Sequence, residues 1–324
     1  MRPLFLAAGQ LAPQRTLIVD CGASGMACYS HWRGAPPTPP ELIADTSTAI
    51  VCTAAADPTR WLTGYDHVAC DHIDADGLLA MAAACRPDLA IAHRDLLIGA
   101  AEAGDFNRWP GEAAFRLMLR VHQAIHTEMV GGVGWQQRIA ELVCTRLDRL
   151  IAESSSPDSD RDAEVAQVLD ARRRLLARDG FAVDSLPGLT VVTWRRRLGR
   201  PSDRFTAVHD PDDLPACALD AVAPAADFQL LGMHDDGGTI WQLDAPRHSW
   251  ARTVILPTVP WPDFAPLAGM FQAQERGSCT WLARPGASRV GFVCLLASQT
   301  PSRLPTEAVT AAIADVVTEG LASR

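Results

Sequence analysis

One histidine and two aspartates occupy alternate positions in the stretch His72-Ile73-Asp74-Ala75-Asp76-Gly77. The short apolar run before them predicts a strand, and alternate side chains of a strand point to the same side. An extended backbone would therefore bring His72, Asp74 and Asp76 together. Carboxylates that close repel each other unless a cation lies between them. Imidazole nitrogen and carboxylate oxygen suit Mn²⁺, Mg²⁺, Fe²⁺ or Zn²⁺, so the spacing predicts a divalent metal site.

Each of these residues also has an ordinary structural explanation. Asp76 would cap the helix predicted from the Ala- and Leu-rich run after Gly77, Asp74 would belong to the turn, and His72 would end the strand. This alternative explains each residue separately, but it does not explain why all three would lie on the same side of the strand. We therefore favour the metal site.

Apolar runs alternate with helical patterns along the first part of the chain. Strands are predicted at residues 17–20, 49–52, 67–72 and 89–93. Helices are predicted from residue 76 and over residues 94–103, with Gly104 just past the end of the second helix. This alternation indicates an α/β fold with a parallel doubly wound sheet, whose strands present ligand sites at their carboxyl ends.

Further polar residues follow these predicted elements and would share the metal site. Asp20 ends the first strand, Asp45 opens a polar stretch, and Asp105 lies in a loop after Gly104, so all three are candidate metal ligands. His31 and His93 are candidate general acids for a leaving oxygen.

Three arginines are candidates for binding a substrate phosphate, because a guanidinium can bond two oxygens at once. Arg94 follows His93, Arg195 opens the run Arg195-Arg196-Arg197, and Arg252 ends the stretch that starts at Arg247. A solvated surface remains the alternative explanation for the two Arg-rich stretches.

The pattern changes twice along the chain, which predicts three parts. Residues 1–130 form the α/β metal-site domain, and residues 131–185 form a helical connector with a Ser- and Asp-rich linker. Residues 186–324 form a smaller α+β domain. Its expected strands lie near residues 189–194, 217–222, 227–231, 239–243 and 290–296, and a helix is expected near residues 306–321.

Composition narrows the class of protein. The net charge is −9, which makes long nucleic acid an unlikely partner, and the 29 cationic side chains are all Arg. Without Lys, Schiff-base chemistry is excluded. Nine scattered cysteines without a CxxC pair predict buried thiols in a reducing cytoplasm. No apolar run approaches the ~20 residues of a membrane span. The oligomeric state stays open.

The segment His72 to Gly77 resembles the first metal-binding motif of the DHH phosphoesterase superfamily. That resemblance implies a divalent metal, usually Mn²⁺, at the edge of a parallel sheet, and a second, smaller domain that contacts substrate phosphate. No Asp-His-His triplet follows the motif in this sequence.

Most of the chain also resembles an uncharacterised bacterial protein family. The stretches that carry the resemblance include Ser30-His31-Trp32, Asp45 to Thr48, His72 to Gly77 and Glu102 to Phe106. It implies that His31, Asp45 and Asp105 gather near His72, Asp74 and Asp76.

Together these features predict a cytoplasmic metal-dependent hydrolase, a phosphoesterase that acts on a small phosphorylated or nucleotide-like substrate. Mn²⁺ is the leading metal, with Mg²⁺, Fe²⁺ or Zn²⁺ as alternatives, and the metal would supply a hydroxide nucleophile. A different reading is a non-catalytic metal- or ligand-binding protein that retains the DHH-like sheet. A third is a metal enzyme of Lewis-acid or oxygen chemistry, which would need a second His beside the first.

Overall fold

The computed structural model describes residues 1–157, 162–195, 214–223, 226–245, 251–255, 262–283, 293–297 and 300–322. The chain divides into two compact units. Unit 1 comprises Met1–Val165 together with Trp250–Pro257, and unit 2 comprises Ala166–Ser249 together with Thr258–Arg324. The first unit therefore takes in most of the predicted helical connector and a short segment from much later in the chain.

A four-stranded parallel sheet forms the base of unit 1. Its strands are β1 (Arg2–Phe5), β4 (His67–Cys70), β2 (Thr16–Val19) and β3 (Ala27–Tyr29), in that order across the sheet. The apolar side chains of β2 are fully buried, as expected for a strand inside a parallel sheet. The predicted α/β architecture with a parallel sheet is confirmed.

Two predicted strands are helices instead. Residues 49–52 lie in α1 (Ser47–Ala55) and residues 89–92 in α4 (Pro87–Ala92). Thr46 starts α1 by accepting a hydrogen bond from the N–H of Ala49, and Pro87 occupies the first position of α4. A short apolar run has no periodicity that separates a strand from a buried helix, so these signals at the helix starts decide.

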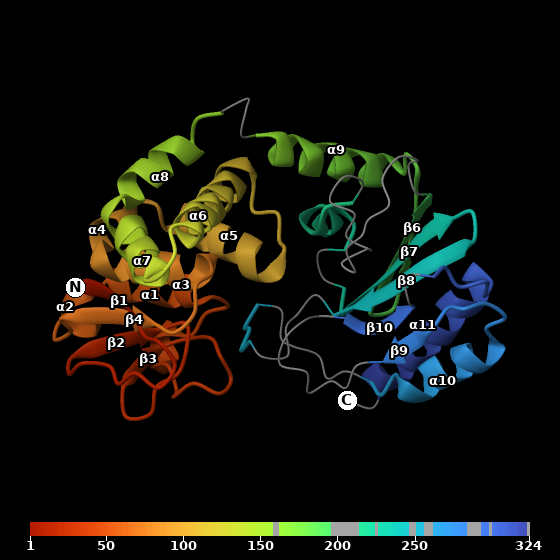
Figure 1. The fold of residues 1–324 in the computed structure, drawn as a ribbon, viewed down its shortest axis with the longest axis horizontal. Coiled ribbons are helices and arrows are strands. Elements are labelled where there is room, and N and C mark those ends of the chain that lie inside the picture. The colour runs from red at the N-terminus through yellow and green to blue at the C-terminus, as the bar shows by residue number, and fades with distance from the viewer. Residues whose placement is uncertain are drawn as a thin grey trace. The chain divides into compact units, whose positions relative to one another are not determined.

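Helices cover the sheet of unit 1. The Ala-rich α3 (Ala75–Cys85) is buried along nearly its whole length and contacts β1, β2 and β4. α1 and α7 (Trp135–Thr145) flank it, and Figure 1 shows these helices together on one side of the sheet, rather than the two-sided arrangement expected of a doubly wound sheet. The remaining helical elements of the unit are η1 (Pro40–Leu42), α2 (Pro58–Trp61), α5 (Arg94–Phe106), α6 (Glu112–Val130) and α8 (Leu147–Ser154).

Gly104 does not end a helix, contrary to the prediction. α5 continues through it to Phe106, and Asn107, with φ 50°, takes the left-handed position that ends the helix. A Cβ on Gly104 would lie 3.0 Å from the Cβ of Ala75, so glycine here allows α5 to approach α3 closely. Asp105 consequently lies in the last turn of α5 and not in a loop.

Unit 2 contains a mixed sheet in the order β5-β6-β7-β8-β10-β9 within the described residues. β6 and β7 are parallel and the other neighbours antiparallel. Phe228, Trp241, Phe264 and Phe271 fill its core. The strands are β5 (Phe181–Leu186), β6 (Leu189–Arg195), β7 (Phe228–Asp235), β8 (Gly238–Asp244), β9 (Trp281–Ala283) and β10 (Val293–Ala297). The helical elements are α9 (Ala163–Ala177), which begins in unit 1, then η2 (Ala216–Ala221), α10 (Ala265–Gln274) and α11 (Thr306–Ala322).

The α+β character of unit 2 agrees with the prediction, and α11 matches the expected closing helix. The strand expected at 217–222 is wrong, since η2, a 3-10 helix, occupies that stretch. No helix in the described part of the chain is long and apolar enough to cross a membrane.

Candidate metal centre

Asp20 lies at the centre of a buried group of acids and histidines in unit 1. It follows β2 with φ 56°, in the left-handed region that Asp tolerates better than most residues. Its Oδ1 lies 3.2 Å from Nε2 of His31 and accepts hydrogen bonds from Ser47 Oγ (2.8 Å) and Trp32 Nε1 (3.2 Å). Its Oδ2 lies 3.0 Å from Nε2 of His72. The two oxygens of one carboxylate therefore face two different imidazoles.

We call the donors around the second imidazole, Asp20, Cys70, His72 and Asp74, the His72 group. Besides Asp20 Oδ2, Oδ2 of Asp74 lies 3.1 Å from His72 Nε2. Two carboxylate oxygens thus face one buried ring nitrogen. Nδ1 of the same ring lies 2.9 Å from Asp71 Oδ1, which fixes the orientation of the ring. Carboxylate oxygens gathered around one ring nitrogen are donors that a cation placed between them could bind.

The His31 group consists of Asp20, His31, Asp76 and Asp105, and it is more deeply buried. Nε2 of His31 lies 3.5 Å from Asp76 Oδ2 and 3.5 Å from Asp105 Oδ2, in addition to Asp20. Nδ1 of His31 lies 2.5 Å from the carbonyl oxygen of Asp45. An Nδ1–H that donates to a carbonyl leaves Nε2 with a lone pair directed at the carboxylates, which is the usual arrangement of a metal-binding histidine.

The predicted shared strand face of His72, Asp74 and Asp76 is not what gathers them. β4 ends at Cys70, Asp74 is the N-cap of α3 through a 2.8 Å bond from the Gly77 N–H, and Asp76 lies in the first turn of that helix. Asp74 therefore joins the His72 group, while Asp76 turns to His31. The helix cap that the alternative explanation assigned to Asp76 belongs to Asp74, which is both a cap and a neighbour of His72.

Burial of so many charges shifts their pKa values. Burial and the neighbouring Asp20 raise the pKa of Asp76 to about 7, and burial with Asp76 raises the pKa of Asp105 well above its usual value. Although burial lowers them, the carboxylates raise the pKa values of His31 and His72. Carboxylates outnumber imidazoles here, so protons or a cation must balance the charge.

Gly77 leaves room for the donors of the His72 group. A Cβ at this position would lie 3.1 Å from both Asp20 Oδ2 and Cys70 Sγ, and 3.3 Å from Asp74 Oδ1. We expect Gly77→Ala to weaken divalent-cation binding about tenfold, in the range seen when groups that orient metal ligands are disturbed. Calorimetric titration with Mn²⁺ and Zn²⁺ measures this.

Gly269 provides the matched control, because it is a helical glycine of α10 with open space around its Cβ position. Gly269→Ala should leave cation binding unchanged and stabilise its helix by about 0.5–1 kcal/mol. Equal cation affinity in Gly77→Ala and wild type would contradict the crowding argument.

Asp45 is near the candidate metal centre, but its carboxylate forms hydrogen bonds with a segment from much later in the chain. Oδ1 accepts hydrogen bonds from the backbone N–H groups of Val254 and Ile255, the latter at 3.1 Å. The prediction of Asp45 as a ligand is therefore replaced by a positioning role, since its carbonyl orients His31 and its carboxylate holds the segment 251–255.

That segment brings Arg252 beside His31. The Arg252 N–H donates to the carbonyl oxygen of His31 at 2.6 Å, and Ala251 pairs with Trp32 in an antiparallel bridge. Nε of Arg33 donates a hydrogen bond to the carbonyl oxygen of Ala251 at 3.1 Å. Of the three arginines predicted to bind phosphate, Arg252 is the one that the structure ties to the candidate centre. Arg247 and Arg196–Arg197 lie outside the described residues.

Three other residues predicted to take part in catalysis or substrate binding make their described contacts outside the candidate metal centre. The described hydrogen bonds of His93 are backbone ones that join α4 to α5. Arg94 is exposed and lies 3.7 Å from Asp95. Arg195 ends β6 in unit 2, where its exposed guanidinium lies 3.5 Å from Asp236. None of these described contacts involves the acid–histidine cluster.

The structure adds residues that the sequence reasoning missed. Trp32 donates to Asp20 and its ring meets His72 edge-on, with ring centres 5.4 Å apart. Ser47 bonds Asp20 from the start of α1. Cys70 also lies in the His72 group, and its place two positions before His72 is a signal that the sequence offered.

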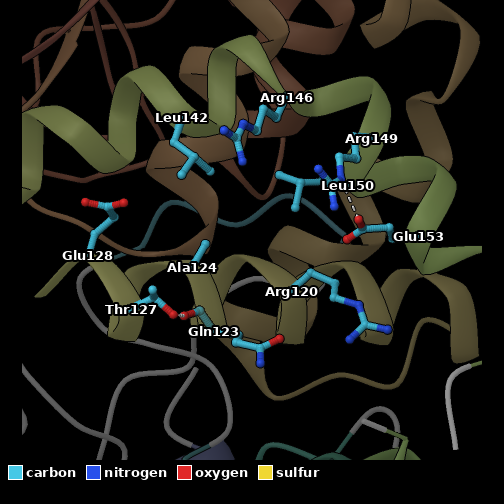
Figure 2. Close-up of a pocket in the computed structure, with 10 residues that line it drawn as sticks. All are labelled: Arg120, Gln123, Ala124, Thr127, Glu128, Leu142, Arg146, Arg149, Leu150 and Glu153. Carbon is cyan, nitrogen blue, oxygen red and sulfur yellow. Dashed lines mark hydrogen bonds and ion pairs between the residues drawn. The ribbon is translucent and has the colours of Figure 1, made fainter. Parts of the chain in front are cut away.

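A pocket of about 220 Å³ lies elsewhere in unit 1, between α6, α7 and α8 (Figure 2). Arginines and acids line it together, and Arg149 is paired with Glu153 at 2.7 Å. It contains no member of the His31 or His72 group, so it is separate from the candidate metal centre.

Comparison with known proteins identifies a family and no close relative. The model of a family of unknown function, DUF6687, matches residues 1–321. No curated protein and no solved structure matches the chain. The likeness to an uncharacterised family is thus confirmed over nearly the whole length, and the likeness to the DHH phosphoesterases rests on the motif alone.

Proposed function

Because the chain belongs to DUF6687, a family of unknown function, its activity must be inferred from its own residues, and we propose that it is a metal-dependent hydrolase of small phosphorylated substrates. The observation that carries the proposal is the position of Asp20, whose two oxygens face two separate imidazole–carboxylate groups. A carboxylate shared in this way is typical of sites that hold two cations for phosphoryl chemistry.

The residues fit such cations. His72, Asp74 and Asp20 Oδ2 would hold one, and His31, Asp105 and Asp20 Oδ1 would hold the other, with Asp76 beside them. A divalent cation in such a site lowers the pKa of a bound water to ~7 and so supplies a hydroxide nucleophile at neutral pH. Among the described residues, His31 and His72 belong to different groups of donor atoms that lie within 4.8 Å of one another. This favours two neighbouring cations over one ion held by both histidines.

The two groups would have different tasks. The side chains of His72 and Asp74 are 31% and 36% exposed, so solvent and substrate can reach them. His31, Asp76 and Asp105 are almost fully buried and would hold charge in place. A catalytic site keeps a coordination position open to substrate, and the His72 group meets that requirement.

Arg252 and Trp32 would receive the substrate in this proposal. Arg252 is held next to His31 by its backbone and can offer a guanidinium to phosphate oxygens. Trp32 covers the edge of His72. His31, predicted as a general acid, is better explained as a ligand, because its Nε2 faces three carboxylate oxygens.

The test is metal-dependent hydrolysis by chelator-treated protein after Mn²⁺, Mg²⁺, Zn²⁺ or Co²⁺ is restored. Substrates should include phosphomonoesters, phosphodiesters and nucleotide anhydrides. We expect phosphate release that requires the cation and falls at least about 100-fold in Asp74→Asn, because asparagine keeps the helix cap while removing a ligand charge.

Asp95→Asn is the matched control, since the Asp95 side chain is 96% exposed, and it should retain wild-type activity. Stoichiometric cation binding without hydrolysis of any of these substrates would overturn the hydrolase proposal. That result would favour the alternative, a non-catalytic metal- or ligand-binding protein.

A further inference from the structure

Cys70 is a thiol among charged groups rather than in an apolar core. It is the last residue of β4 and is fully buried. Its Sγ lies 3.6 Å from Nδ1 of His72. One donor atom from each of Asp20, Cys70 and His72 lies within 4.8 Å of the other two.

Two independent features of the fold bring this thiol to the metal donors. Cys70 ends β4, and His72 follows it by two residues in the short stretch between β4 and α3. From the other side, α3 presents a glycine, and the place that a Gly77 Cβ would occupy is 3.1 Å from both Cys70 Sγ and Asp20 Oδ2. The sulfur and the carboxylate oxygen thus converge on the same small space.

A thiolate changes which metal a site prefers. Oxygen-only and mixed oxygen–nitrogen sites suit Mg²⁺ and Mn²⁺, whereas a thiolate favours Zn²⁺ and other later transition metals. Cysteine sulfur, imidazole nitrogen and carboxylate oxygen are all donors that bind Zn²⁺ in proteins.

We propose that the Cys70 thiolate is a direct ligand of the cation in the His72 group, together with His72 and Asp20, and that this position selects Zn²⁺, or Co²⁺ in its place, over Mn²⁺ and Mg²⁺. On binding, the S–H proton leaves to solvent and a metal–sulfur bond forms. The inference rests on the proposed function only in requiring that the cluster binds a divalent cation, and it replaces Mn²⁺ as the leading metal at this position.

Cobalt substitution tests the inference without an activity assay. Metal-free protein is titrated with Co²⁺, and the near-ultraviolet charge-transfer absorption of a cobalt–thiolate bond is recorded. We expect this band in wild type and its loss in Cys70→Ser, with Co²⁺ still bound through the remaining donors. The same substitution should weaken Zn²⁺ at least about tenfold and leave Mn²⁺ nearly unchanged.

Cys28→Ser is the matched control. Cys28 is also buried, but its thiol is directed at the carbonyl oxygens of Ala23 and Met26, so the band should remain. Cys21→Ser is a second control, which tests whether the metal instead binds the separate group formed by Cys21, Cys70 and Asp71. The proposal assigns the metal to Cys70, so the band should survive in Cys21→Ser.

Zinc X-ray absorption on the wild-type protein covers the case in which Cys70→Ser does not fold. One sulfur neighbour at about 2.3 Å, retained in Cys21→Ser and Cys28→Ser, supports the proposal. Cobalt or zinc bound with only nitrogen and oxygen neighbours overturns it and leaves the proposed hydrolase site standing. Absence of any stoichiometric cation in the wild type overturns both.

Discussion

Replacing Asp20 with asparagine is expected to weaken divalent-cation binding by at least about 100-fold, because loss of a shared ligand should exceed the 10- to 100-fold effect of disturbing a group that merely orients one. Oδ1 faces His31 and Oδ2 faces His72, at 3.2 and 3.0 Å, so a single change affects both groups. Asparagine removes the negative charge and turns one acceptor oxygen into a donor. Metal content after equilibrium dialysis, with plasma mass spectrometry as the readout, measures the effect.

The substitution is suited to this question because it spares the backbone. Asp20 has φ 56°, and asparagine accepts this left-handed conformation as readily as aspartate, whereas alanine would be strained by about 1 kcal/mol or more. Thermal unfolding should therefore confirm a folded variant. Asp95→Asn, at an exposed position, should bind cations like the wild type. If Asp20→Asn also retained its full complement of metal, the shared-carboxylate arrangement would be refuted.

Replacing Asp76 with alanine is expected to reduce the local stability of α1 by about 3–5 kcal/mol, a loss that comes from leaving buried groups unpaired. Its two carboxylate oxygens accept the N–H groups of Ser47 and Thr48, each at 2.7 Å, and its backbone carbonyl accepts the Thr48 hydroxyl at 3.0 Å. These N–H groups belong to the first turn of α1, where the helix dipole also favours a negative charge. Asp76 is thus the anchor between α3 and the start of α1.

Hydrogen exchange of the amides of residues 47–55 measures this loss directly. A local probe is required because a chain of two units does not unfold in a single two-state step. Asp74→Ala is the matched comparison, since it removes one N-cap bond and should cost only about 1 kcal/mol in α3. Equal protection of α1 in the two variants would show that Asp76 is not its anchor.

Ser47 illustrates why the anchor matters for the site. It is the first residue of α1, its N–H is held by Asp76, and its hydroxyl bonds Oδ1 of Asp20. Loss of Asp76 should therefore disturb Asp20 as well as the helix. The candidate metal centre and the core of unit 1 are built from the same hydrogen bonds.

Local sequence was sufficient for several conclusions. Buried apolar strands, an Ala-rich helix after Gly77, and aspartates and histidines at the ends of these elements could all be inferred from composition and spacing. The parallel α/β sheet followed from them, whereas the expectation that His31 and Asp105 lie near His72 came from the resemblance to an uncharacterised family. These features are encoded by neighbouring residues, and neighbours share a strand face or a helix turn whatever the rest of the chain does.

Tertiary structure alone decided which residues meet. The pairing of β2 with β4 places Asp20 beside His72, and the close approach of α5 to α3 at Gly104 brings Asp105 to His31. Thr46 caps the start of α1, so the predicted strand at residues 49–52 is part of that helix. The first residue of α1, Ser47, donates a hydrogen bond to Asp20. The Asp45 carboxylate accepts a hydrogen bond from the backbone N–H of Ile255, which is 210 residues further along the chain. Contacts between residues far apart in sequence depend on the packing of whole elements and on hydrogen bonds formed only in the folded chain, so local spacing does not contain them.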